Sequence, residues 1–266
     1  MSAATVVADS GNIYECDAVS LELFPHGKRR LIIDRLSLNV RTGEFLTIVG
    51  SSGTGKSTLL RLLGGLVPAT SGNIRFRGAA VAGAPSGVVV VFQDYSNALL
   101  QWRTVARNIA LGIEDKLDKA EVDARIRQSL QMVGLEKNAL DHPWQLSGGM
   151  QQRVQIARAL ALKPQVMLMD EPFGALDAMT KASLQDEVLK VHQQTGTSFV
   201  FITHDIEEAV YLGDRVIVLA GPPGRIHNAV DITLPRPRDQ MSTRQSPEFL
   251  RYRAEIHDAV LAAGGH

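Results

Sequence analysis

The residues of this chain that could do chemistry begin with a glycine-rich stretch, Gly50-Ser51-Ser52-Gly53-Thr54-Gly55-Lys56-Ser57-Thr58. It fits the pattern G-x-x-x-x-G-K-[ST], in which the glycines let backbone N–H groups wrap a chain of phosphates. In this pattern Lys56 places a positive charge on the β- and γ-phosphates, and Ser57 offers a hydroxyl to Mg²⁺. Thr58 helps to hold the α-phosphate. The stretch therefore predicts a loop that binds a nucleoside triphosphate.

A second glycine-containing motif follows about ninety residues later, Leu146-Ser147-Gly148-Gly149-Met150-Gln151-Gln152-Arg153. It opens a helical run that reaches Leu162, so its N–H groups form a second anion site at a helix start. Taken alone, the motif could also be an ordinary capped helix start. Two separated phosphate sites in one chain favour a sandwich of two chains.

Two carboxylates end an apolar run, Val166-Met167-Leu168-Met169-Asp170-Glu171-Pro172. Asp170 at the end of the predicted strand is placed to hold Mg²⁺ through water. Glu171 lies one residue further, outside the strand and next to the metal, where it could reach an attacking water. The alternative for Glu171 is a surface ion pair.

The elements that must position these residues belong to an α/β fold. A strand from Glu44 to Val49 leads into the glycine-rich loop, and a helix from Lys56 to Leu66 follows it. Short continuous apolar runs indicate strands buried on both faces of a largely parallel sheet. These runs are Val88–Phe92, Val166–Met169, Phe199–Ile202 and Val216–Leu219.

Other parts of the chain differ from the central strands in composition and hydrophobic pattern. Alternating apolar stretches between Val19 and Val40, interrupted by Pro25, His26 and Gly27, predict antiparallel strands. The region from Tyr95 to Leu162 is rich in helix formers, and Asp118 is placed to cap a helix from Lys119 to Val133. After Gly221 the chain is rich in proline, and a helix over Pro247–Leu261 ends a tail that we expect to be peripheral to the nucleotide chemistry.

These differences in composition and predicted secondary structure divide the chain into four segments. Residues 1–94 form the first part of a nucleotide-binding core, with the antiparallel sheet and the phosphate loop. Residues 95–162 form a helical subdomain, residues 163–232 the second part of the core, and residues 233–266 a C-terminal tail.

Composition excludes several function classes. The 28 basic residues balance the 28 acidic ones, which gives no support for a nucleic-acid surface. Cys16 is the single cysteine, so no internal disulfide can form. Met1–Ser10 lacks the features of a signal peptide, and no segment offers the roughly 20 apolar residues that span a bilayer. We therefore expect a cytosolic protein whose membrane link runs through partners.

The two motifs together resemble those of the ABC ATPases, whose LSGGQ signature corresponds to Leu146–Met150, with Met150 in place of glutamine. The resemblance extends from Val19 to about Arg238. It implies a RecA-like P-loop NTPase core with an N-terminal antiparallel β-subdomain and an inserted helical signature subdomain. In that family the signature of one chain closes over the γ-phosphate held by a second copy, so Ser147, Gly148 and Gly149 would act in trans.

The resemblance also implies roles for single residues. Glu171 corresponds to the general base and His204 to the switch histidine that contacts the γ-phosphate. Gln93 corresponds to the Q-loop glutamine that ligates Mg²⁺. Asp177 would act across the dimer interface, and it could at the same time cap the helix over Ala178–Gln194. Phe24 lies where the family stacks an aromatic ring on adenine, although packing in the core is an alternative.

The stretch Phe92–Val105 is similar to the Q-loop region of importers for nitrate, sulfonates and taurine, with Gln101 in place of a proline. The resemblance implies ATP and Mg²⁺ as cofactors and transmembrane permease subunits as partners. A periplasmic or extracellular solute-binding protein would be an indirect partner, acting through the permease. The chain would lie at the cytoplasmic face of the cell membrane. The groove from Tyr95 to Trp102 is the candidate dock for a permease helix.

Three alternative functions share part of these features. A soluble ABC ATPase of DNA repair would need a long coiled-coil insertion, and one of translation would need two such domains in one chain. A small-molecule kinase would have no use for Leu146–Arg153. An exporter ATPase stays open, because the sequence of the ATPase indicates the direction of transport only by family resemblance. The transported substrate contacts the partner chains and cannot be identified from this chain.

Overall fold

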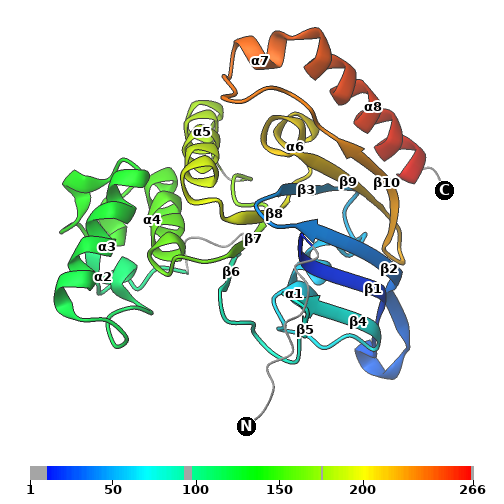
Figure 1. Ribbon diagram of the computed structural model, residues 1–266, viewed down its shortest axis with the longest axis horizontal. Coiled ribbons are helices and arrows are strands. Elements are labelled where there is room, and N and C mark those ends of the chain that lie inside the picture. Colours follow the sequence, from blue (N-terminus) through cyan, green and yellow to red (C-terminus); the bar gives the residue numbers. More distant parts are fainter. Residues whose placement is uncertain (1–10, 93–97, 175, 265–266) are drawn as a thin grey trace.

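The computed structural model of the chain describes residues 11–92, 98–174 and 176–264 (Figure 1). Gln93, which the sequence predicts as a Mg²⁺ ligand, lies outside these residues. Across the described ranges, no helix combines the length and the apolar character that crossing a membrane requires.

The central sheet has the strand order β10-β9-β3-β8-β7-β6. Its strands are β3 (Phe45–Val49), β6 (Val88–Val91), β7 (Val166–Asp170), β8 (Ser198–Ile202), β9 (Arg215–Ala220) and β10 (Arg225–Asp231). All neighbours pair in parallel except β9 and β10. Every residue of β3, β7 and β8 is buried, which confirms the strands predicted from continuous apolar runs. β10 was not predicted, because its sequence has no such run.

A second, four-stranded sheet is antiparallel and has the order β2-β1-β4-β5. It consists of β1 (Asn12–Leu23), β2 (Arg30–Arg41), β4 (Ser71–Phe76) and β5 (Ala79–Ala80). A short 3-10 turn, η1 (Pro25–Gly27), joins β1 to β2, as the sequence predicts for this segment. The hairpin brings Leu23 opposite Arg30.

The helices of the described residues are α1 (Lys56–Leu63), α2 (Val105–Ala110), α3 (Lys119–Met132), α4 (Gly148–Ala161), α5 (Ala178–Thr195), α6 (Ile206–Leu212), α7 (Ser242–Gln245) and α8 (Pro247–Gly264). Two 3-10 turns, η2 (Glu136–Asn138) and η3 (Pro143–Gln145), precede α4. The side chain of Asp118 accepts a 2.9 Å hydrogen bond from the Glu121 amide and caps α3, as predicted.

Side chains of the central sheet alternate between two cores, one on each face. Phe45 of β3 and Phe199 of β8 belong to the core shared with α4, α5, α6 and α8. Leu46 and Val200 belong to the core shared with α1 and the antiparallel sheet. The period of two along a strand assigns successive residues to opposite layers.

The helices α2, α3 and α4 form a group to one side of the central sheet, drawn in green in Figure 1. Among them α4 packs on α2 and α3 and also touches β6 and α5. α4 therefore joins the helical subdomain to the core, and it carries the signature motif at its start.

The C-terminal segment packs closely on the core. Phe249, Tyr252 and Ile256 of α8 are buried, and α8 contacts β9, β10 and α6. A Cβ built at Gly264, the end of α8, would lie 3.4 Å from the Ser51 Oγ. The C-terminal tail is therefore part of the packed structure, and its end lies close to the phosphate loop. β9 is the neighbour of β3, so a helix packed along β9 ends near the loop that follows β3.

Candidate functional site

The predicted phosphate-loop, carboxylate and histidine residues meet at the carboxyl ends of three adjacent strands. The phosphate loop follows β3, Asp170 ends β7 and Glu171 follows it, and His204 follows β8, which lies between β3 and β7. A cleft of about 630 Å³ opens at this edge of the sheet. Its lining comprises Arg30, Ile32, Gly50, Ser52, Gly53, Gly55, Lys56, Ser57, Thr58, Glu171 and His204. The position agrees with the general rule that open α/β sheets bind ligands at the carboxyl ends of their strands.

The phosphate loop has the backbone that its glycines allow. Gly55 precedes α1 with a φ of +92°, and a Cβ built there would lie 2.7 Å from the Ile33 Cδ1. The Lys56 Nζ donates hydrogen bonds of 2.8 Å to the carbonyls of Gly50 and Ser51. Burial lowers the pKa of Lys56, and the charge of Glu171 opposes this shift. The loop thus holds a buried cation at the start of a helix, which suits a phosphate anion.

Two hard oxygen donors lie together beside the loop. The Ser57 Oγ donates a 3.0 Å hydrogen bond to the Asp170 Oδ1. Burial raises the pKa of Asp170, although the Ser57 hydroxyl opposes the shift. A Mg²⁺ ion prefers few protein oxygens together with water and phosphate, so this pair fits that ion. No cluster of three or more His, Cys, Asp or Glu side chains suited to a metal occurs in the described residues.

Glu171 and His204 form a pair at the mouth of the cleft. The His204 Nδ1 lies 3.2 Å from the Glu171 Oε2. Glu171 adopts a φ of +44°, unusual for a residue with a side chain, and its amide donates a 3.0 Å hydrogen bond to the Ile202 carbonyl. Such strain is often found at functional sites. It places the carboxylate where the cleft and the histidine meet.

The signature residues lie apart from this cleft. Ser147 caps α4 by accepting a 3.3 Å hydrogen bond from the Met150 amide. Gly149 is buried, and a Cβ built there would lie 2.4 Å from the Thr180 Cγ2. Asp177 caps α5 through hydrogen bonds of 3.1 and 3.0 Å from the amides of Met179 and Thr180. Ser147, Gly148, Gly149 and Asp177 are absent from the residues that line the cleft.

The structure settles one alternative for Phe24. This side chain is 63% exposed, so it does not pack in the core. It does not line the cleft either, but it follows Leu23, the cross-strand partner of the lining residue Arg30. Arg30 and Ile32 were not predicted. The signal for them was the hairpin register, because residues two apart on a strand share a face.

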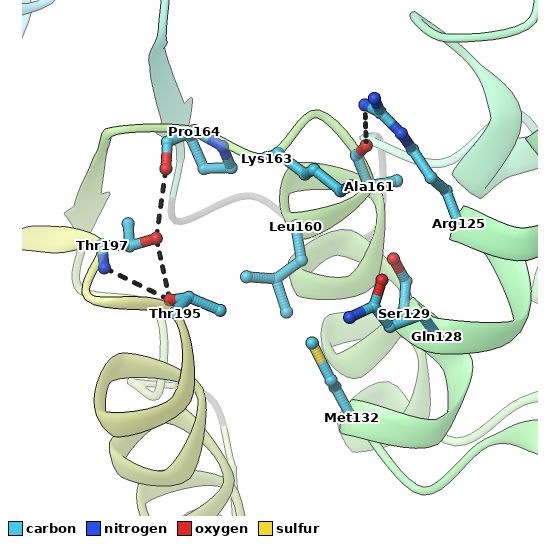
Figure 2. Close-up of a pocket in the computed structure, with 10 residues that line it drawn as sticks. All are labelled: Arg125, Gln128, Ser129, Met132, Leu160, Ala161, Lys163, Pro164, Thr195 and Thr197. Atoms are coloured by element: carbon cyan, nitrogen blue, oxygen red, sulfur yellow. Dashed lines mark hydrogen bonds between the residues drawn. The ribbon is translucent and has the colours of Figure 1, made fainter. Parts of the chain in front are cut away.

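A second cavity, of about 220 Å³, lies between the helical subdomain and the core (Figure 2). It lies before β7 and β8, at the edge of the sheet opposite the nucleotide cleft. The Thr197 Oγ1 donates to the Pro164 carbonyl at 3.1 Å, and the Thr195 Oγ1 donates to the Thr197 Oγ1 at 2.9 Å. The Arg125 Nη1 donates to the Ala161 carbonyl at 3.1 Å. These groups bond within the protein and mark a seam between subdomains.

Comparisons with known proteins agree with this geometry. The family model "ABC transporter" matches residues 33–174. An uncharacterized ABC transporter ATP-binding protein, MJ0412 of Methanocaldococcus jannaschii, is 48% identical over 87% of this chain and 85% of its own length. The taurine import ATP-binding protein TauB of Pseudomonas aeruginosa is 41% identical over 92% of this chain and 94% of its own. The nitrate import ATP-binding protein NrtC of Synechococcus elongatus is 42% identical over 87% of this chain, which spans 36% of NrtC.

A solved structure has the same fold. It is a dimeric post-hydrolysis state of the ATP-binding cassette MJ0796 bound to ADP and Pi. The TM-score is 0.73 at 30% identity, over 82% of this chain and 98% of that one. The phosphate loop, the carboxylate pair and the signature helix thus occur on the fold expected for them, and the chain belongs to the ABC transporter family.

Proposed function

We propose that this ATPase is the energy-supplying subunit of an importer for a small solute of the nitrate, sulfonate or taurine class. The observation that carries the supply of energy is the cleft in which the phosphate loop, Asp170, Glu171 and His204 meet, since these residues fit ATP hydrolysis. The name of the similar TauB supports the import of a small sulfonate, and the name of NrtC supports nitrate.

The residues of the cleft take the following roles. The loop amides, Thr58 and Lys56 bind the phosphates of ATP. Ser57, Asp170 and Gln93 would hold a Mg²⁺ ion, which would supply positive charge to the phosphate oxygens. Glu171 accepts the proton of the attacking water, and His204, 3.2 Å from it, orients the carboxylate and contacts the γ-phosphate. The chemistry then depends on positioning and electrostatics.

Two copies of the chain complete each site. Within one chain the signature is separate from the cleft, so Ser147, Gly148 and Gly149 are available to the nucleotide of a partner. Asp177, at the start of α5, is likewise separate from the cleft and would act across the dimer interface. The dimeric cassette MJ0796, bound to ADP and Pi, supports this head-to-tail arrangement. Closure of the dimer on ATP is the step that would drive transport.

The remaining partners are transmembrane permease subunits, with a solute-binding protein acting on their outer side. The chain would sit at the cytoplasmic face of the cell membrane as a peripheral subunit. Trp102, next to α2, is 76% exposed and supports docking of a permease helix there, although Tyr95 lies outside the described residues. No nucleic acid is expected, because the charge is balanced.

Purification of the tagged chain from gently solubilised membranes of its host tests the importer proposal. Mass spectrometry should recover a multi-span permease at a stoichiometry close to that of the chain. A Lys56→Ala variant serves as control, since permease docking should survive the loss of ATP binding. Recovery of ribosomal or DNA-associated proteins in place of a permease would overturn the transport proposal while leaving the ATPase activity intact.

A further inference from the structure

A cation that the ATPase chemistry does not explain lies in the wall of the nucleotide cleft. Arg30, the first residue of β2, is exposed and lines the cleft together with the phosphate loop and Glu171. The other lysine or arginine in that lining, Lys56, is buried and bonded to loop carbonyls. Arg30 is therefore the cation of the lining that a nucleotide could meet from the side of the antiparallel sheet.

The register of β2 places Arg30 along the cleft. β2 touches the phosphate loop through Ile32, whose carbonyl would lie 3.2 Å from a Cβ built at Gly55. Two residues of a strand span about 7 Å, and residues two apart share a face. Arg30 thus lies about 7 Å beyond the loop contact, on the face of Ile32. Its cross-strand partner Leu23 directly precedes the exposed Phe24. Arg30 occupies the interval between the loop and Phe24.

The guanidinium of Arg30 is not committed elsewhere in the described structure. Its neighbour Arg29 is bonded to Glu22, with a distance of 2.7 Å from Nε to Oε2. Arg225 is bonded to Asp34 in the same region. Arg30 makes no side-chain hydrogen bond and no ion pair with any described residue. A free guanidinium in a phosphate-binding cleft can form a two-pronged contact with phosphate oxygens.

We propose that Arg30 is a further nucleotide-binding residue, which pairs with the phosphate nearest the ribose while Lys56 holds the β- and γ-phosphates. The inference rests on the proposed binding of ATP at the phosphate loop. It adds a contact with the part of the nucleotide that ATP and ADP share. Arg30 then sets the affinity for both nucleotides and leaves the rate of the chemical step unchanged.

The size of the effect follows from the exposure of the side chain. Exposed charge pairs contribute little, and charge-assisted, two-pronged contacts with phosphate contribute more. Replacing Arg30 with alanine should therefore weaken the binding of both ATP and ADP by about threefold to tenfold. A lysine keeps the charge but loses the planar fork of the guanidinium. The nucleotide affinity of Arg30→Lys should therefore lie between that of the unchanged chain and that of Arg30→Ala.

Calorimetric titration of ATP and ADP into the purified chain, with steady-state hydrolysis alongside, tests the proposal. Arg30→Ala should raise both dissociation constants and KM by similar factors, with kcat within about twofold of the unchanged chain. The difference from the unchanged chain should shrink at about 0.5 M salt. Arg29→Ala is the matched control, since it removes an adjacent positive charge that is bonded to Glu22 outside the cleft.

Two outcomes would overturn the proposal. One is an Arg30→Ala variant that binds ATP and ADP as the unchanged chain does. The other is equal weakening in Arg29→Ala, which would reduce the effect to net charge. Thermal unfolding of each variant shows that it is folded. The proposed function fails if the unchanged chain binds no ATP, or if Lys56→Ala binds ATP as tightly as the unchanged chain does. If the unchanged chain binds ATP and Lys56→Ala does not, the comparison with Arg30→Ala tests the role of Arg30 alone.

Discussion

At the scale of single residues, Glu171 carries the most specific expectation. Its carboxylate pairs with His204 at 3.2 Å, and its φ of +44° directs it to the cleft. A general base contributes about 10²–10⁴-fold to a rate. Glu171→Gln keeps the size of the side chain but cannot accept the proton, so phosphate release should fall at least about 100-fold while ATP binding persists.

Phosphate release and nucleotide titration measure the two effects of Glu171→Gln separately. Glu136→Gln is the control, because that carboxylate is exposed in η2, away from the cleft. If Glu171→Gln kept more than about a tenth of the activity, another group would be the base.

At the scale of elements, the spacing between α4 and α5 depends on Gly149. A Cβ at this position would lie 2.4 Å from the Thr180 Cγ2, so alanine cannot fit unless the Thr180 side chain or one of the two helices shifts. Overpacking costs about 1–3 kcal/mol, and the better helix propensity of alanine returns up to about 1 kcal/mol. Gly149→Ala should therefore lower the free energy of unfolding by about 1–2 kcal/mol.

Thr180→Ser removes the methyl group in question, and the cap from Asp177 is retained because it uses the backbone amide of residue 180. The double variant should recover most of the stability in urea unfolding without nucleotide. Equal stability of Gly149→Ala and the double variant would show that this contact does not set the spacing. Because ATP is absent, the measurement is independent of any role of the signature in trans.

A second element-scale expectation concerns Asp214, which ties β3 and α5 to the chain after β10. It accepts a 2.9 Å hydrogen bond from the Phe45 amide and one of 2.6 Å from Arg236, and it faces His192. Burial alone would raise the pKa of Asp214, but the nearby His192 and the hydrogen bonds from Arg236 and Phe45 outweigh burial and hold this pKa well below its usual value. The folded chain therefore favours the charged carboxylate.

The sign of the pH dependence follows from that lowered pKa. The carboxylate contributes its full stabilisation above its unfolded pKa of about 4, and this is lost as pH falls through the folded value. The difference in unfolding free energy between the unchanged chain and Asp214→Asn should thus be constant near neutrality and shrink as pH falls below about 4. Urea unfolding across this range measures it, with Asp123→Asn as an exposed control; a gap independent of pH would contradict the assignment.

At the scale of the whole molecule, the C-terminal segment is part of the folded core. Phe249 of α8 is 1% exposed, whereas Phe24 in the hairpin is 63% exposed. Removing a buried phenylalanine side chain costs about 3–5 kcal/mol, while surface substitutions stay within about 0.5 kcal/mol. Phe249→Ala should therefore lower the midpoint of thermal unfolding strongly, and Phe24→Ala should leave it in place.

The variants Phe249→Ala and Phe24→Ala also distinguish an effect on stability from an effect on ATP binding. Phe24→Ala should weaken ATP binding if its ring stacks on adenine, while the fold is unaffected. A Phe249→Ala variant as stable as the unchanged chain would mean that α8 is an appendage. Since α8 ends beside Ser51 of the phosphate loop, loss of its packing should also disturb nucleotide binding.

The sequence by itself determined what depends on neighbours along the chain. The phosphate loop, the buried strands and the caps at Asp118 and Ser147 are local features, in which a few adjacent residue types decide the backbone. The family followed from two such motifs, Gly50–Thr58 and Leu146–Arg153. The positions of Ser57 and Asp170 were predicted as well, each from its own motif.

Only the tertiary structure decided which of these motifs meet. Ser57 and Asp170 lie 113 residues apart, and they touch because β8 alone separates β3 from β7. Three further features depend in the same way on strand order and hairpin register. They are the place of Arg30 in the cleft, the exposure of Phe24 and the position of the end of α8 beside the phosphate loop. Spacing along the chain cannot reveal them, because strand order and register are set by burial of apolar faces between distant segments.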